Sequence, residues 1–266
     1  MEIEVTIQNL IQNSDILTKE NYLIPSRYVS GRIVEYDIKA ANANVMYHEG
    51  LLNESQYKYF ISLPKIDREI ALGNLQRQNN TIYRRYIEGI LKFRQKLIET
   101  NNIQEDEIIR IAKDAIYVNR FDDLKYTKFD NVEFAKKSES SNMIQLLDLI
   151  IFSKYINNTI DIDVKGLGKN TELHQQFMLS LIANVIYMFE RVSLLDSISY
   201  LTHMYEQYVK KQLPIGFYRQ LNSQSGYLIP MYNMIVFEGS DLSMIDISYN
   251  ITYLRELHNI LFEQFH

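Results

Sequence analysis

The chain has 266 residues, 46% of them hydrophobic, which is enough apolar material for one large domain or two modest ones. Its formal net charge of -5 does not by itself indicate a nucleic-acid binder, because affinity for phosphates depends on clustered Lys and Arg. The absence of cysteine excludes disulfides and thiolate metal sites, so we expect a reducing, cytoplasmic location. No signal peptide or transmembrane run is recognisable, and no membrane partner is expected.

The first part of the chain centres on a strand that ends in an aspartate. Residues 3–7 predict a strand and residues 11–17 a helix, and Ser30-Gly31 predicts a hairpin turn. The alternating residues 33–38 then predict a strand, followed by a helical segment at 40–47. Asp37 lies at this junction, where a carboxylate can point into a cleft and hold a cation.

Three helices are predicted between residues 53 and 100. Asn53 can cap a helix at 54–63, and Pro64 can open the next one, at 65–78. A longer helix at 81–100 has apolar residues spaced by three or four positions. Its other face carries basic residues, and the local basic cluster comprises Arg84, Arg85, Lys92, Arg94 and Lys96.

A second aspartate is predicted at the tip of a hairpin. Residues 108–118 indicate two short strands that break at Lys113-Asp114-Ala115. If this hairpin lies beside the strand at 33–38, Asp37 and Asp114 meet. Two carboxylates with no cysteine and few histidines suit a hard cation, Mg²⁺ or alternatively Mn²⁺, which takes substrate phosphate as a further ligand. That combination is typical of two-metal phosphoryl or nucleotidyl transfer.

The remaining chain predicts a β meander followed by helices. Short alternating runs, including 124–126, 132–134, 146–155 and 160–164, lie between residues 119 and 168. A helical region at 174–212 ends before Pro214, and a strand pair at 217–227 and 235–237 precedes a final helix at 249–265. We therefore predict two domains, 1–170 with inserted finger-like helices at about 53–100, and 171–266.

Two of these stretches resemble motifs of family B DNA polymerases. DIKAANANVM, at 37–46, resembles motif A, whose pattern is roughly DxxSLYPSII, and AKDAIYV, at 112–118, is similar to motif C, DTDSIFV. Asp37 falls on the metal-binding aspartate of motif A and Asp114 on the second aspartate of motif C. The resemblance implies that both are catalytic metal ligands. It also implies an α+β fold, with a palm-like antiparallel sheet, packed helices and a mainly helical, thumb-like C-terminal half.

Later residues extend the resemblance. Lys154-Tyr155 and Val164-Lys165-Gly166-Leu167 look like the basic patch and KGI loop that follow motif C in that family. This implies that Lys154 and Lys165 contact the backbone of a primer.

The chain also departs from the family pattern. Ala112 replaces the first aspartate of motif C, and Asn42 stands where the family has the tyrosine that excludes a ribose 2'-hydroxyl. Motif B, KxxxNSxYG, is absent, and Lys65 and Arg68 are a loose substitute that we assign to the triphosphate. Asn42 is correspondingly the residue expected near the sugar.

The leading interpretation is a minimal, virus- or phage-encoded nucleotidyltransferase or polymerase. It would use magnesium and a nucleoside triphosphate on a DNA or RNA end, with nucleic acid contacting Lys154, Lys165, Arg85 and Lys92. One alternative is a non-catalytic, degenerate palm that binds nucleic acid or other replication proteins, or inhibits a host protein. Another is a structural protein in which both aspartates are turn residues.

Overall fold

The computed structural model describes residue 16 and residues 18–157, 159–166, 176–218, 227–230 and 248–264. The chain forms two compact units, one from Met1–Pro25 and Arg32–Glu139, the other from Ser26–Gly31 and Ser140–His266. The predicted α+β class is confirmed, with antiparallel strands and packed helices. The predicted boundary near residue 170 falls in 167–175, outside the described residues, so that division stays a prediction.

The strands of the first unit follow the order β1-β3-β4-β2-β6, and β5 pairs with β6. Their bounds are β1 Asn21–Leu23, β2 Tyr28–Ile38, β3 Ile108–Ala112, β4 Ala115–Asn119, β5 Lys128–Phe129 and β6 Val132–Leu146. Side chains alternate between the two faces of a strand. In β2, Val34, Tyr36 and Ile38 therefore join the core that contains residues of α2 and α5, while Glu35 and Asp37 point to the opposite face.

Two sequence predictions about strands are wrong. Ser30 and Gly31 do not form a turn, because β2 begins at Tyr28 and continues through them. Gly31 has a φ of 137°, a conformation that glycine adopts readily and that lets the strand continue. The segment 124–126 is not a strand, and Leu124 instead donates its amide to the Tyr36 hydroxyl at 2.9 Å.

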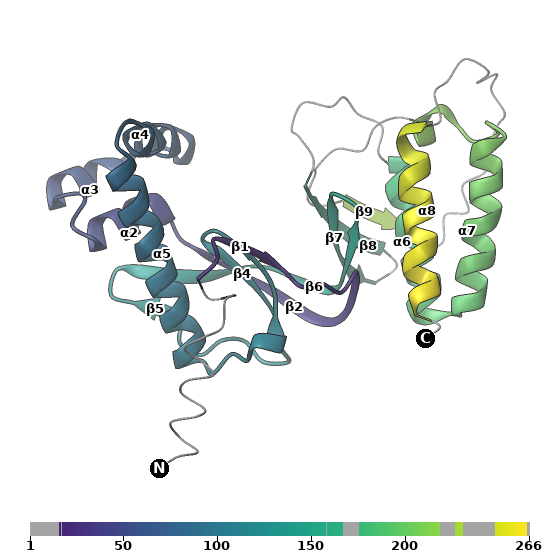
Figure 1. The fold of residues 1–266 in the computed structure, drawn as a ribbon, viewed down its shortest axis with the longest axis horizontal. Coiled ribbons are helices and arrows are strands. Elements are labelled where there is room, and N and C mark those ends of the chain that lie inside the picture. The colour runs from purple at the N-terminus through teal and green to yellow at the C-terminus, as the bar shows by residue number, and fades with distance from the viewer. Residues whose placement is uncertain are drawn as a thin grey trace, which may run out of the picture. The chain divides into compact units, whose positions relative to one another are not determined.

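The helices of the first unit agree closely with their predicted bounds. They are α2 Ala41–His48, α3 Glu54–Ser62, α4 Lys65–Gln78 and α5 Asn80–Thr100, and a 3-10 turn, η1, covers Glu105–Glu107 (Figure 1). Asn53 caps α3 as expected, since its Oδ1 accepts the Gln56 amide at 2.9 Å. Helix α2 lies very close to α5, because a Cβ added at Gly89 would come within 2.6 Å of Val45 Cγ1.

The second unit combines strands in the order β6-β7-β8-β9 with helices. Its further elements are β7 Leu149–Ile156, β8 Thr159–Lys165, α6 Gln176–Arg191, α7 Leu194–Val209, a 3-10 turn η2 Ile215–Tyr218, β9 Tyr227–Pro230 and α8 Ser248–Glu263. Helices α7 and α8 run alongside each other (Figure 1). Apolar residues of the strands and helices share one core, which includes Ile151, Ile162, Leu201 and Leu257.

The predicted helical region at 174–212 is interrupted. Ser193 separates α6 from α7, and its hydroxyl accepts the Asp196 amide at 3.3 Å as an N-cap. The strand expected from Phe217 is also wrong at its start, because Phe217 lies in η2.

Several predicted elements lie outside the described residues. They are the strand at 3–7, the strand at 235–237 and nearly all of the helix at 11–17. Among the helices that are described, none is long and apolar enough to cross a membrane.

Candidate functional site

The pairing of β2 with β4 brings Asp37 and Asp114 together. Asp37 lies opposite Ala115 in the register, and the Ile38 amide donates to the Asp114 carbonyl at 3.2 Å. The charge of Asp37 acts on the Asp114 carboxyl, which indicates that the two side chains are neighbours. The sequence predicted this meeting from two short motifs, and the functional role of the pair stays a prediction.

The pair carries more negative charge than its surroundings favour. Burial, and then the charge of Asp37, raise the pKa of Asp114 to about 6. Neighbouring carboxylates resist simultaneous ionisation, so the charge of Asp37 favours the protonated form of Asp114. A cation placed between them would relieve that repulsion.

A lysine from β6 already supplies part of that positive charge. Lys137 Nζ lies 3.0 Å from Asp37 Oδ2 and 3.1 Å from Glu35 Oε1. Burial lowers the pKa of Lys137, but its hydrogen bond to Asp37 and the charge of Glu35 outweigh this and raise it. Glu35 is only 2% exposed and also accepts the Ser138 hydroxyl at 2.8 Å.

Sequence reasoning missed both Glu35 and Lys137. The strand alternation could have indicated Glu35, because it lies two residues before Asp37 on the same face. Lys137 had no such signal, since it reaches the pair only through the long-range arrangement of β6.

Tyr86 of α5 is a further residue whose electrostatics involve the pair. It is buried, and burial followed by the charge of Asp114 raises the pKa of its phenol. The hydroxyl therefore stays protonated at neutral pH and remains a hydrogen-bond donor.

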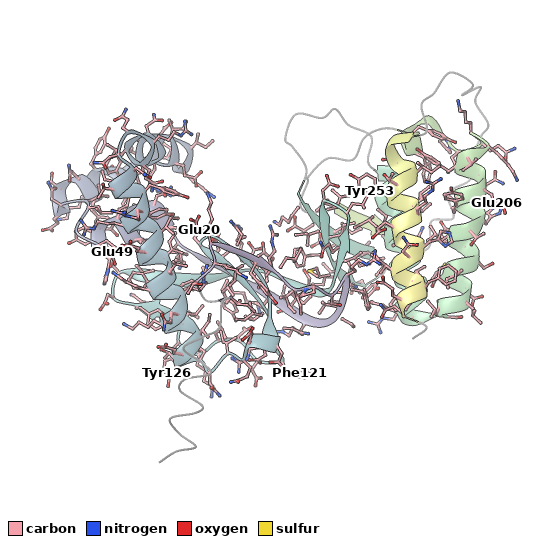
Figure 2. The ribbon with its side chains drawn as sticks, viewed as in Figure 1. Glu20, Glu49, Phe121, Tyr126, Glu206 and Tyr253 are labelled. Carbon is pink, nitrogen blue, oxygen red and sulfur yellow. The ribbon has the colours of Figure 1, made fainter. Side chains whose placement is uncertain are left out.

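The hairpin tip that carries Asp114 is held by a buried arginine. Arg94 of α5 is 1% exposed, and its guanidinium donates to the Lys113 carbonyl at 3.2 Å and to the Lys19 carbonyl. Lys113 itself has a φ of 52° and donates its amide to the carbonyl of Glu20, a residue labelled in Figure 2. The prediction that Arg94 belongs to an exposed basic cluster is therefore wrong, because its guanidinium is buried and binds backbone carbonyls.

Replacing Arg94 with Met should destabilise the protein by about 2 kcal/mol, because the carbonyls of Lys19 and Lys113 each lose a donor worth about 1 kcal/mol. Methionine retains much of the apolar packing of the arginine stem. Urea unfolding would measure the change, with Arg84→Met, an exposed position on the same helix, as the matched control. Equal stability of the two variants would show that Arg94 does not hold the hairpin.

The residues assigned to the nucleotide lie on α2 and α4. Asn42 is half-buried, and its Oδ1 accepts a hydrogen bond from Gln76 Nε2 at 3.0 Å. Lys65 is exposed and lies 3.8 Å from Glu69, a weak pair between helical neighbours. Arg68 is half-buried, with a long contact of 3.5 Å to the Leu63 carbonyl. Their proposed roles stay predictions.

The basic residues predicted on α5 share one partner on the segment after α2. Arg85 donates to the Glu49 carbonyl, and Lys92 Nζ lies 3.1 Å from Glu49 Oε2 (Figure 2). Both are exposed, as predicted. These contacts fasten α2 to α5, so nucleic acid would have to compete with them.

Lys154 and Lys165 belong to the second unit, whereas Asp37 and Asp114 belong to the first. Lys165 Nζ lies 2.6 Å from Asp163 Oδ2, and Lys154 is paired in register with Asp161. Burial, and then the charge of Asp163, raise the pKa of Asp161. Both lysines therefore have acidic neighbours, and their contact with nucleic acid stays a prediction.

Together these features define an α+β protein whose antiparallel sheet carries Asp37 and Asp114 on neighbouring strands, with Lys137 bridging Asp37 and Glu35. The chain belongs to the family of the bacteriophage PBS1 gene 130 protein, whose family model matches residues 9–262. No match was found among curated proteins. The family is that of a phage protein, in agreement with the predicted source. Its description names no activity and gives no support to the resemblance with family B polymerases.

Proposed function

We propose that the chain is a palm-type nucleotidyltransferase or polymerase that acts with magnesium on a nucleoside triphosphate and a nucleic-acid end. The observation that carries the proposal is the pairing of β2 with β4, in which Asp37 lies opposite Ala115 and the Ile38 amide donates to the Asp114 carbonyl at 3.2 Å. Two aspartates from separate motifs are therefore neighbours, which supports a shared role for them.

The donor atoms at this site suit Mg²⁺ or Mn²⁺. Both carboxyls offer hard oxygen ligands, and Mg²⁺ is commonly held by one or two carboxylates together with water and substrate phosphates. The part of the chain that the structure describes holds no group of three or more His, Asp or Glu arranged for a metal ion. At a site of two carboxylates, water and the triphosphate would supply the remaining ligands. When bound, such an ion stabilises negative charge on the phosphate oxygens.

The protein's own residues would divide the remaining tasks. Asp114 must lose its proton to help Asp37 hold the ion, and the raised pKa of Asp114 opposes this loss. Lys65 and Arg68 would bind the triphosphate, and Asn42 would face the sugar. Lys154, Lys165, Arg85 and Lys92 would contact DNA or RNA.

The proposal is tested by nucleotide binding in the presence and absence of metal. Calorimetric titration of the full chain with a nucleoside triphosphate should show affinity that depends on Mg²⁺. Asp37→Asn should weaken it about tenfold or more, because the loss of one charged ligand costs at least about 1.4 kcal/mol. Asp106→Asn, at an exposed position, is the matched control. The proposal would be overturned if the affinity for nucleotide were the same with and without Mg²⁺, or if Asp37→Asn left that affinity unchanged.

One observation favours the non-catalytic alternative, a degenerate palm that binds nucleic acid or a replication protein. Lys137 already balances one of the two negative charges of Asp37 and Glu35, and a site with its own cation can be stable without metal. Ala112 also offers no carboxylate in the β3–β4 hairpin. This alternative predicts nucleic-acid binding that is independent of both Mg²⁺ and nucleotide.

A further inference from the structure

We infer that Lys137 competes with the divalent cation for Asp37, so that the site takes up a metal–triphosphate complex in preference to free metal. The inference rests on the proposed function and concerns how the same site is loaded. It starts from the ammonium group, which lies at hydrogen-bonding distance from Asp37 Oδ2, one of the oxygens that a metal ion would need.

The two carboxylates that hold Lys137 differ in exposure. Glu35 is 2% exposed and accepts a hydrogen bond from Ser138, so its carboxylate stays in place when the Lys137 ammonium group moves. The side chain of Asp37 is 27% exposed and lies beside Asp114. Lys137 itself is 53% exposed, which leaves its long side chain room to turn. An arriving cation would thus displace Lys137 from Asp37 while Glu35 keeps the ammonium nearby.

The charges explain why the phosphate matters. A divalent ion and an ammonium group at the same carboxylate repel each other, so free metal binds weakly. A triphosphate brings negative charge that interacts favourably with both cations. Lys137 therefore opposes the free ion and supports the complex, and its removal should change the two affinities in opposite directions.

The test measures Mn²⁺ alone and Mn²⁺ with a nucleoside triphosphate, using the spin-resonance signal of free Mn²⁺ and the full chain. Lys137→Met should bind free Mn²⁺ about tenfold more tightly, as expected when a nearby repelling charge is removed. The same variant should bind the Mn²⁺–triphosphate complex about tenfold more weakly, because a charged phosphate contact is lost. Lys136→Met is the matched control, since its ammonium pairs with Asp123 and Glu139 instead.

A second variant guards against misfolding of the first. Lys137→Met leaves the buried Glu35 without its lysine, whereas Lys137→Met combined with Glu35→Gln removes both charges and keeps Asp37. The double variant should show the same gain in affinity for free Mn²⁺. If neither variant binds free Mn²⁺ more tightly than the wild type, the inference is wrong. The proposed function is judged by a separate result. It is wrong if the wild type does not bind the Mn²⁺–triphosphate complex, or if Asp37→Asn does not reduce that binding.

Discussion

Asp114→Asn should reduce nucleotide incorporation about a thousandfold and, at the same time, make the folded protein more stable. The loss is expected because a catalytic ion contributes several kcal/mol and each 1.4 kcal/mol or so is a factor of ten in rate. The gain is expected because asparagine keeps the shape of the turn residue and can donate a hydrogen bond to Asp37. Primer extension and thermal unfolding measure the two effects.

The gain in stability should depend on pH. Asp114 has a folded pKa of about 6, above its ordinary value of 3.8, so the buried carboxylate destabilises the folded state once it ionises. This penalty is absent below about pH 4, grows as the pH rises towards 6 and is constant above that. At pH 8, Asp114→Asn should therefore be more stable than the wild type by about 3 kcal/mol, because a neutral side chain removes the penalty that the raised pKa of Asp114 represents.

The matched control is Asp106→Asn, at an exposed position in η1, which should change neither activity nor stability. If Asp114 were only a turn residue, its replacement would leave nucleotide incorporation unchanged, while the gain in stability would remain. A variant that unfolds more easily than the wild type at pH 8 would contradict the electrostatic account of the pair.

Gly166→Ala should destabilise the protein by about 3 kcal/mol or more, because it combines backbone strain with a steric clash. Gly166 follows β8 with a φ of 105°, which residues with a side chain rarely adopt. An added Cβ would lie 2.0 Å from the carbonyl oxygen of Asp148, in the turn between β6 and β7. Asp148 also accepts a hydrogen bond from the Tyr253 hydroxyl at 2.9 Å, so its displacement would disturb α8 (Figure 2).

Chemical unfolding would measure this loss, and two other glycines provide controls. Gly73 lies within α4 with nothing within 4 Å of an added Cβ, so Gly73→Ala should stabilise the protein by about 1 kcal/mol. Gly50 has a φ of 67° but no close neighbour, so Gly50→Ala should show the cost of strain alone, about 1 kcal/mol. If Gly166→Ala lowers the free energy of unfolding by no more than Gly50→Ala does, the turn that contains Asp148 can move away from the added Cβ without a loss of stability.

The Gly166 prediction also separates two explanations of the Lys165-Gly166 motif. The polymerase resemblance assigns this loop to nucleic acid, whereas the structure shows a backbone contact that only glycine permits. A destabilised Gly166→Ala variant would show that the glycine has a structural role whatever the lysine binds.

Local signals in the sequence were sufficient for much of the first unit. Asn53 and Pro64 mark the starts of α3 and α4 because capping depends on neighbouring residues alone. The break at Lys113-Asp114 likewise marked the hairpin of β3 and β4. Ser30-Gly31 misled the prediction because a glycine suits an irregular strand as well as a turn.

The sequence by itself determined the two acidic motifs and the helices between them, because each depends on short-range periodicity. It predicted that Asp37 and Asp114 meet only on the condition that their strands lie side by side, and the tertiary structure decided that β2 pairs with β4. Only the tertiary structure decided that Arg94 is buried beneath the hairpin and that Lys137 and Glu35 join the aspartates. Burial and ion pairing depend on residues that are far apart in the chain, such as Asp37 and Lys137. The residues next to each of them therefore do not predict that the two side chains pair.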